Sequence, residues 1–168
     1  RTVTVPAVNA GEYFMIELDT PFQFNGMEKL VVDFVRTGSC TGSVLLRYDK
    51  SVPANQALYS AGTTSVFGSL TFPPNMRFHF AGGDDTVEFG GTSGASTPFT
   101  GTPTRVQLLY TADEISGSGT ITGLGFQVDQ LTTEQTYSYA VKMGHTTLAV
   151  LSANFASNTT GVSQTTVG

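Results

Sequence analysis

Residues able to do acid–base or nucleophilic chemistry are few in this chain, and their spacing matches no catalytic motif. The chain has two histidines, His79 and His145, one cysteine, Cys40, and 13 acidic residues scattered along it. Catalysis needs a nucleophile or an acid–base pair held by its neighbours, and no nucleophile elbow, phosphate loop or zinc-protease helix motif is found. We therefore expect a non-enzymatic protein in which His79 faces solvent and His145 bonds a turn carbonyl.

The single cysteine limits the disulfides and thiolate metal sites that the chain can form. Cys40 has no partner for a disulfide within the chain, and a site of four thiolates is excluded. Its surroundings, residues 38–42, are typical of a turn. A thiol without a role and an exposed thiol that pairs with another chain both remain open.

Carboxylates are densest in residues 82–88, which we call the acidic turn. Asp84, Asp85 and Glu88 lie there beside two glycines, and closely spaced oxygen ligands suit Ca²⁺. The alternating ligand spacing of an EF-hand loop is absent. A solvated turn is the favoured interpretation, Ca²⁺ binding is the alternative, and no other cofactor is expected.

Aromatic rings could bind carbohydrate, as they often do in secreted β-sandwiches. Trp is absent, and Tyr and Phe offer less area for stacking on a sugar. The candidate platforms lie beside turns or in a loop rich in small residues: Phe22, Phe24, Tyr59 and Phe99. Packing in the core or in turns is the simpler interpretation of these rings.

Strands must position these groups. Only 12% of the residues are charged, whereas Gly, Thr and Ser are abundant, and this composition favours strands and tight turns over helices. Alternation of apolar and polar residues recurs in about ten short segments. We expect an all-β fold with two antiparallel sheets, a sandwich or jelly roll, as a single domain over residues 1–168.

The same alternation predicts the core. Residues 146–155 have helical spacing and could form one or two turns of helix, and residues 90–103 are typical of a long exposed loop. The side chains assigned to inward faces are Phe14, Ile16, Leu18, Val32, Phe34, Phe78, Phe80, Phe126, Tyr139 and Val141.

Charge and composition exclude some partners. The formal net charge of −5 leaves no basic stripe for phosphates, so we expect neither nucleic acid nor a polybasic membrane contact. No apolar run approaches the roughly 20 residues of a bilayer span. Scarce lysine, many hydroxyl side chains and a glycosylation sequon at Asn158 favour an extracellular or cell-surface location. A start at Arg1, with neither Met nor signal peptide, predicts a processed unit.

Two blocks resemble a β-sandwich module that recurs in large secreted and cell-surface proteins of environmental bacteria. Residues 11–26, with Leu30-Val31-Val32, are similar to its I-x-L-x-T-P-F-x-Y-N-G…L-V-V signature. Residues 109–126 and 139–147 are similar to its Y-x-A-x-E-I, G-x-I-x-G-I-x-F and M-G-H-T-T stretches. The resemblance covers nearly half of the chain, leaves residues 37–104 unmatched, and implies a sandwich without a catalytic motif.

The order of the blocks departs from the module, in which the M-G-H-T-T block precedes the T-P-F block. The chain resembles a permuted version, in which residues 163–168 would run into residues 1–6 as one strand. The two ends then lie side by side in a closed domain, or each completes a neighbouring copy. The residues predicted to mediate such assembly are Thr2, Val3, Thr4, Val5, Thr165, Thr166 and Val167.

An uncharged strand such as residues 2–8 seldom remains an unpaired edge. We expect it to pair with residues 163–167 or with a neighbouring subunit. The sequence therefore predicts a structural or adhesive subunit of a surface filament or coat, whose partners are copies of itself or neighbouring surface-protein domains. A carbohydrate-binding module of a secreted hydrolase, with polysaccharide as its partner, is the alternative, and a viral capsid or fibre jelly roll is a third possibility.

Overall fold

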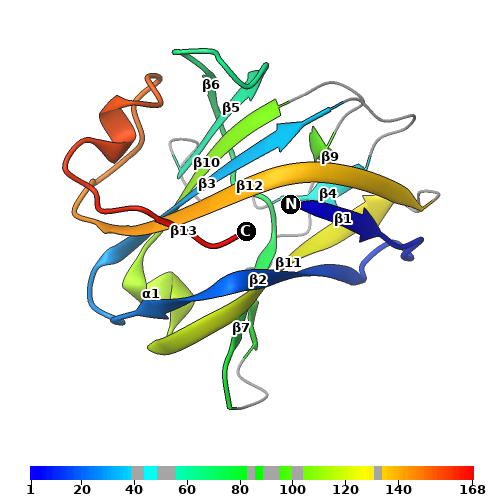
Figure 1. Ribbon diagram of the computed structural model, residues 1–168, viewed down its shortest axis with the longest axis horizontal. Coiled ribbons are helices and arrows are strands. Elements are labelled where there is room, and N and C mark those ends of the chain that lie inside the picture. The colour runs from blue at the N-terminus through cyan, green and yellow to red at the C-terminus, as the bar shows by residue number, and fades with distance from the viewer. Residues whose placement is uncertain (39–43, 49–55, 83–85, 89–94, 100–103, 131–133) are drawn as a thin grey trace.

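Two antiparallel sheets pack face to face in the computed structural model, which describes residues 1–38, 44–48, 56–82, 86–88, 95–99, 104–130 and 134–168 (Figure 1). The first sheet has seven strands in the order β1 (Thr2–Val5), β12 (Gln135–Thr146), β3 (Lys29–Thr37), β10 (Thr104–Tyr110), β5 (Ala57–Ala61) and β6 (Ser69–Thr71), with β13 (Thr165–Thr166) also paired with β12.

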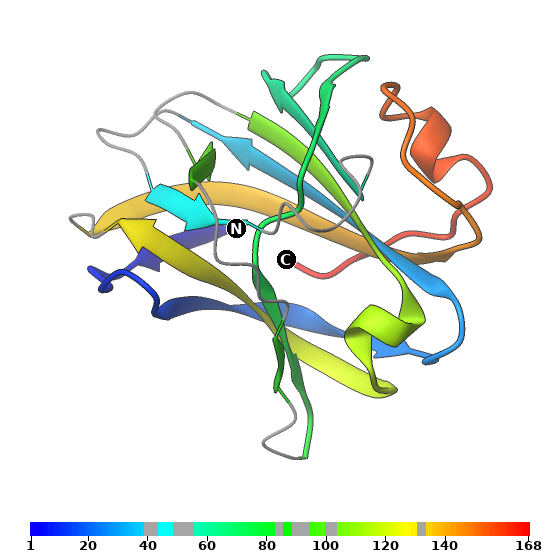
Figure 2. The same cartoon turned by 180° about the vertical axis from the view of Figure 1, so that it is seen from behind.

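The second sheet has six strands. Their order is β8 (Thr86–Glu88), β7 (Met76–Phe80), β11 (Gly119–Gln130), β4 (Val44–Arg47) and β9 (Ala95–Phe99), with β2 (Tyr13–Phe24) also paired with β11. Two short helices, α1 (Ala112–Ile115) and the 3-10 turn η2 (Ser157–Thr159), lie outside the sheets. Figure 2 shows the two layers from behind. The predicted all-β two-sheet sandwich is confirmed.

The core lies between the sheets, where alternation directs the apolar side chains. All ten residues assigned to inward faces are buried. Phe126 on β11 is packed against Phe14 of β2, with ring centroids 5.5 Å apart, and against Phe34 of β3 at 5.9 Å. Each buried aromatic side chain stabilises the fold by about 1.5–3 kcal/mol, and the contact of Phe126 with Phe34, which crosses between the layers, helps to hold the two sheets together.

Strand β3 departs from simple alternation because both of its faces are covered. Val31 and Asp33 point away from the main core and are nevertheless buried. Residues 147–164 fold back over the outer face of the first sheet, where Leu151 and Phe155 form a second apolar cluster with Leu58 and Leu109 (Figure 1). The predicted helix over residues 146–155 is wrong: β12 continues to Thr146, and no helix occurs in the segment that follows until η2.

A buried polar network fastens this covering segment. The Asp33 carboxylate accepts hydrogen bonds from Arg105 Nε (3.0 Å) and Nη2 (2.6 Å) and from Gln107 Nε2 (3.1 Å). Gln107 Nε2 also donates to the carbonyl of Phe155, and Gln107 Oε1 accepts from Asn158 Nδ2 at 3.0 Å. Asn158 is therefore an internal residue of the fold. A glycan on its Nδ2 is incompatible with these bonds, so the sequon gives no support to an extracellular location.

Residues 90–103 also differ from the prediction of a long loop. Residues 95–99 form β9, which pairs with β4. The β-propensity of Thr and Phe and the available edge of β4 account for the strand.

Candidate functional site

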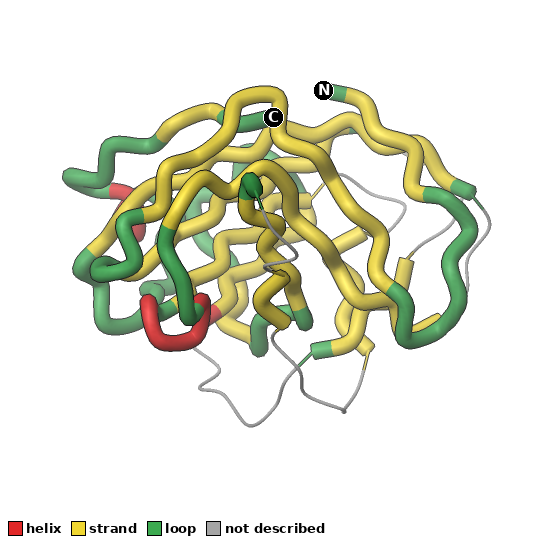
Figure 3. The backbone as a smooth tube through the Cα atoms, turned by 90° about the horizontal axis from the view of Figure 1, so that it is seen from below, coloured by secondary structure: helices red, strands yellow, loops and turns green. Residues whose placement is uncertain are grey.

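The two ends of the chain share one edge of β12, and we call this place the terminal junction. β1 pairs with residues 135–138 of β12, and β13 pairs with Lys142 and Met143. The Arg1 amine donates to the Tyr139 carbonyl (2.9 Å), and the Tyr139 N–H donates to the Arg1 carbonyl (2.7 Å). The Val141 N–H donates to the Gly168 carbonyl at 2.6 Å. Only Ala140 separates the two β12 residues that hold the ends, and Figure 3 shows the termini beside each other.

Alternation of side chains in β1 explains its place on β12. Val5 is buried in the core and Val3 packs against it. The opposite face carries hydroxyl pairs, Thr2 with Ser138 and Thr4 with Thr136, each 3.2 Å apart. One side of the strand is thus held by burial and the other by cross-strand hydrogen bonds.

The terminal junction also connects the two sheets through β2. The Arg1 guanidinium donates to the carbonyl of Glu17 (2.5 Å) and to the Asp19 carboxylate (2.6 Å). From the other end, the Val167 carbonyl accepts the N–H groups of Asp19 (2.7 Å) and Thr20 (3.2 Å). Both ends therefore contact the same stretch of β2.

Tyr139 lies at the terminal junction as a core residue. Its ring stacks on Phe34 at 5.0 Å. Burial raises the pKa of the Tyr139 phenol; the Arg1 charge lowers it and the Asp19 carboxylate raises it further. The phenol is therefore neutral at physiological pH, and its role here is packing.

The sequence predicted which residues lie at the terminal junction but not the strand with which they pair. The seven predicted assembly residues do lie in or next to the strands at the junction. Residues 2–5 are paired in a sheet and the two ends lie side by side, as expected. The pairing partner differs from the expected residues 163–167, because both end strands run along β12 end to end and do not face each other. Arg1, Glu17 and Asp19 were missed, since charged residues in strands carry no periodic signal that distinguishes an ion pair from a solvated face.

Comparison with protein family models, curated proteins and solved structures finds no match. The resemblance to a bacterial surface module therefore stays a prediction that depends on the residues quoted for it.

Most of the predicted sugar platforms do not present a free ring face. Phe22 and Phe24 are buried in the core, because they continue the inward alternation of β2. Tyr59 is half-buried and packs against the same core. Phe99 belongs to β9, but its side chain lies outside the described residues. Carbohydrate stacking at Phe22 and Phe24 is thus contradicted by their burial.

His145 uses its imidazole differently from the prediction. Its Nε2 accepts a hydrogen bond from the backbone N–H of Asn25 at 3.1 Å, whereas donation to a turn carbonyl was expected. The ring stacks on Phe24, with centroids 5.7 Å apart. Pairing of His145 with Leu30 places the ring beside the β2–β3 turn, so its role is to fix that turn. His79 is exposed on β7, as predicted.

The calcium prediction falls largely outside the described residues. Asp84 and Asp85 are not described, and Glu88 is described only as the end of β8, where its backbone pairs with Arg77. Within the described part of the chain, no group of three or more His, Cys, Asp or Glu residues could hold a metal ion. Cys40 also lies outside the described residues.

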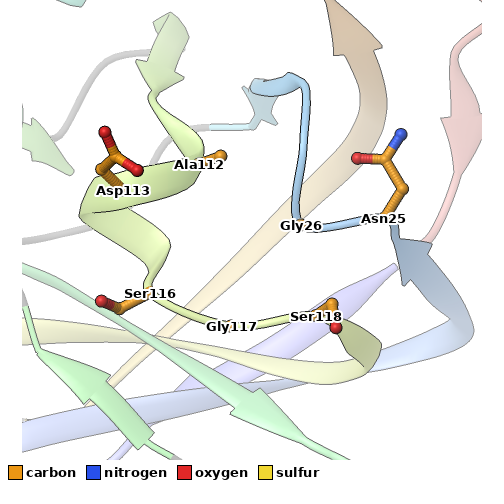
Figure 4. A pocket seen from close by; sticks show the side chains of 7 residues that line it. All are labelled: Asn25, Gly26, Ala112, Asp113, Ser116, Gly117 and Ser118. Carbon is orange, nitrogen blue, oxygen red and sulfur yellow. The ribbon is translucent and has the colours of Figure 1, made fainter.

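A pocket of about 420 Å³ lies between the β2–β3 turn, α1 and the turn that leads to β11 (Figure 4). The side chains of Asp113 and Ser116 point away from Asn25. The Asn25 Oδ1 is already an acceptor for the N–H groups of Met27 and Glu28. The polar groups that line this pocket therefore do not converge on a common point, as an acid–base pair would.

No helix among the described residues is long and apolar enough to cross a membrane.

Proposed function

We propose that the chain is a non-enzymatic structural module of an extracellular or cell-surface assembly, which binds copies of itself or neighbouring surface-protein domains through its terminal strands. The observation that carries this proposal is the terminal junction. β1 and β13 lie end to end on one edge of β12 and are the two chain ends. Either end strand can therefore detach from the edge of β12 with little displacement of the other strands.

Exchange between copies would conserve the bonds of the junction. A β1 strand from a second copy can form the same four-residue register on β12, with Val5 in the core and the same hydroxyl pairs outside. Exchange of an identical element is a low-cost route to assembly, because the bonds lost and gained are the same. Assembly then depends on concentration and on the connection between β1 and β2.

The remaining described surface supports a role without catalysis. The pocket in Figure 4 has no converging acid–base pair. The low share of charged residues, 12%, limits the sensitivity of strand pairing to pH and salt to contacts such as that of Arg1 with Asp19. Carbohydrate binding has weaker support, because Phe22 and Phe24 are buried.

The test removes β1 and returns it in trans. A chain lacking residues 1–8 leaves half of the β12 edge open, and we expect it to bind a synthetic peptide of residues 1–8 and to recover its thermal stability on binding. A matched peptide with Thr and Val exchanged at positions 2–5 has the same composition but places Thr in the core, so it should not bind. Fusion of the native peptide to a second subunit should then yield polymers in sedimentation velocity.

Peptide binding and subunit association each offer a result that would contradict the proposal. If the truncated chain gains no stability from the native peptide, or if the native and exchanged peptides act alike, the β12 edge does not select its strand. If the untruncated chain of residues 1–168 remains a monomer at millimolar concentration and the fused subunits do not associate, assembly through terminal strands is refuted.

A further inference from the structure

The turn between β2 and β3 contains Asn25 and Gly26, the only Asn-Gly pair in the chain. An asparagine followed by glycine can react with its own backbone, because glycine has no side chain to hinder attack of its nitrogen on the preceding carboxamide. Both residues are partly exposed. The pair is therefore a candidate site of covalent self-modification, and the contacts around Asn25 determine whether the fold favours the reaction.

Hydrogen bonds hold the Asn25 carboxamide over the backbone that follows it. Its Oδ1 accepts the N–H groups of Met27 (2.9 Å) and Glu28 (3.0 Å), which is the pattern of an Asx turn. A side-chain oxygen that bonds the N–H two residues further on folds its carboxamide back towards the intervening peptide nitrogen. The Cγ atom of Asn25 is thus directed towards the nitrogen of Gly26, the atom that would attack it.

The same two N–H groups suit the charge that develops during the attack. When the Gly26 nitrogen adds to Cγ, negative charge collects on Asn25 Oδ1. Backbone N–H groups aimed at such an oxygen form an oxyanion hole, and here they belong to Met27 and Glu28. Because these bonds strengthen as the oxygen becomes charged, they stabilise the transition state more than the resting amide.

The attacking and the leaving nitrogen are also well placed. Within the described part of the chain, the Gly26 N–H forms no hydrogen bond that the attack would have to break. Asn25 Nδ2, which would leave as ammonia, donates to Glu28 Oε2 at 2.7 Å. A carboxylate at this distance can take up a proton as the attack begins and return it to the departing nitrogen. The pocket beside Asn25 and Gly26 opens to solvent and admits water (Figure 4).

We infer that Asn25 is a self-modification site, at which the folded chain forms a succinimide with Gly26 and then an aspartate or isoaspartate. In the first step, the bond between Gly26 N and Asn25 Cγ forms and the Cγ–Nδ2 bond breaks, and the proton lost by Gly26 leaves with the amide nitrogen as ammonia. In the second step, solvent water adds its OH to either carbonyl carbon of the succinimide and its H to the ring nitrogen. The reaction is independent of the terminal junction and of the proposed function.

The product weakens the β2–β3 turn. A carboxylate at position 25 loses the donor to Glu28 and places a second negative charge beside that residue, where like charges repel. An isoaspartate also lengthens the main chain by one carbon atom, which displaces the N–H that Asn25 donates to His145 Nε2 at 3.1 Å. The turn cannot absorb this change by moving inward, since a Cβ at Gly26 would already lie 2.7 Å from Ser118 Cβ. We therefore expect the modified turn to move away from His145 into solvent.

Peptide mapping by mass spectrometry tests the inference. The folded chain is incubated at neutral pH in water enriched in heavy oxygen, which labels the new carboxylate, and we expect Asn25 to convert while Asn9 stays intact. Asn9 is the matched internal control, because its Nδ2 also contacts a carboxylate three residues further on, that of Glu12 at 3.1 Å, but Ala10 follows it. Glu28→Gln keeps an acceptor for Nδ2 and removes the group that carries the proton, so it should slow conversion several-fold.

Three results would overturn the inference. If Asn25 stays intact in the folded chain while a synthetic peptide of residues 20–31 converts alongside it, the fold protects the site. If Asn9 converts as fast as Asn25, neither the glycine nor the Asx turn selects the site. If folded Glu28→Gln, checked by circular dichroism, converts at the unmodified rate, the Glu28 carboxylate carries no proton. If Glu28→Gln does not fold, Glu28→Ser serves as the variant.

Discussion

Asn158 should be essential for stability although the sequence marks it as a glycan acceptor. Its Oδ1 accepts the Ser152 N–H at 2.8 Å, and its Nδ2 donates to Gln107 Oε1 and to the Ser152 carbonyl, both at 3.0 Å. Asn158→Ala leaves the Gln107 oxygen buried without this donor, and a buried unsatisfied polar group costs about 1–3 kcal/mol. The Ser152 groups lie near the surface, where water replaces part of the loss. We expect a total loss of about 3 kcal/mol, or a fall in melting temperature of about 6–12 °C.

Thr160→Ala is the matched control, because it abolishes the same sequon and leaves Asn158 intact. The Thr160 hydroxyl donates only to the Ala156 carbonyl at an exposed position, so a change below about 0.5 kcal/mol is expected. Since the chain has no Trp, urea unfolding is best followed by far-ultraviolet circular dichroism. If the two variants unfold within 0.5 kcal/mol of each other, the network around Gln107 does not stabilise the covering segment and the reasoning is refuted.

Three further predictions concern the core, the loss of stability at acid pH and the acidic turn. Phe126→Ala should reduce the free energy of unfolding by about 3–5 kcal/mol, and Gln127→Ala by about 1–2 kcal/mol, because the Gln127 amide bonds Asn75 and the Gly11 carbonyl; equal shifts in denaturant midpoint would contradict the register of β11. Hydrogen bonds from the backbone and side chain of Asn9 lower the pKa of Glu12, so the stability that this carboxylate adds is present above its ordinary value of 4.5 and is lost as the pH falls through the lowered one. Glu12→Gln should flatten the acid side of a plot of melting temperature against pH, and an unchanged plot would show that the contact adds nothing. If the acidic turn binds Ca²⁺, millimolar Ca²⁺ should raise the melting temperature and a chelator should lower it. A melting curve that is changed neither by Ca²⁺ nor by the chelator argues against a metal in the acidic turn.

Inward faces could be read from the sequence because the two-residue period of a strand is a local property. Phe14, Phe34 and Phe126 were assigned inward from their immediate neighbours alone, and they meet in the core. The same rule places Gln127 on the outer face, but it does not show that a polar side chain there will find partners elsewhere in the chain, as the Gln127 amide does with Asn75 and the Gly11 carbonyl. It also missed Asp33, since no local pattern indicates that a distant segment covers the outer face of β3.

The sequence predicted most residues of the terminal junction but not how they pair. The alternation of residues 2–5 indicates a strand that needs a partner, and the resemblance to a permuted module predicts that the two ends lie together. The choice of β12 as that partner depends on contacts between residues more than 130 positions apart, such as Thr2 with Ser138. No short-range pattern encodes such a pairing.

The meeting of both ends on β12 determines how the protein would respond to mechanical load. Handles attached at Arg1 and Gly168 would apply opposite forces to two neighbouring points, so tension would bypass the layered core. The first bonds to break would be those of Arg1 with Tyr139 and of Gly168 with Val141. The end strands would then detach from β12 one hydrogen bond at a time. Sequential breaking of hydrogen bonds needs a lower force than shear, which must break several of them at once. In a pulling experiment, the sandwich should therefore release its two end strands as a soft extensible element before its body yields.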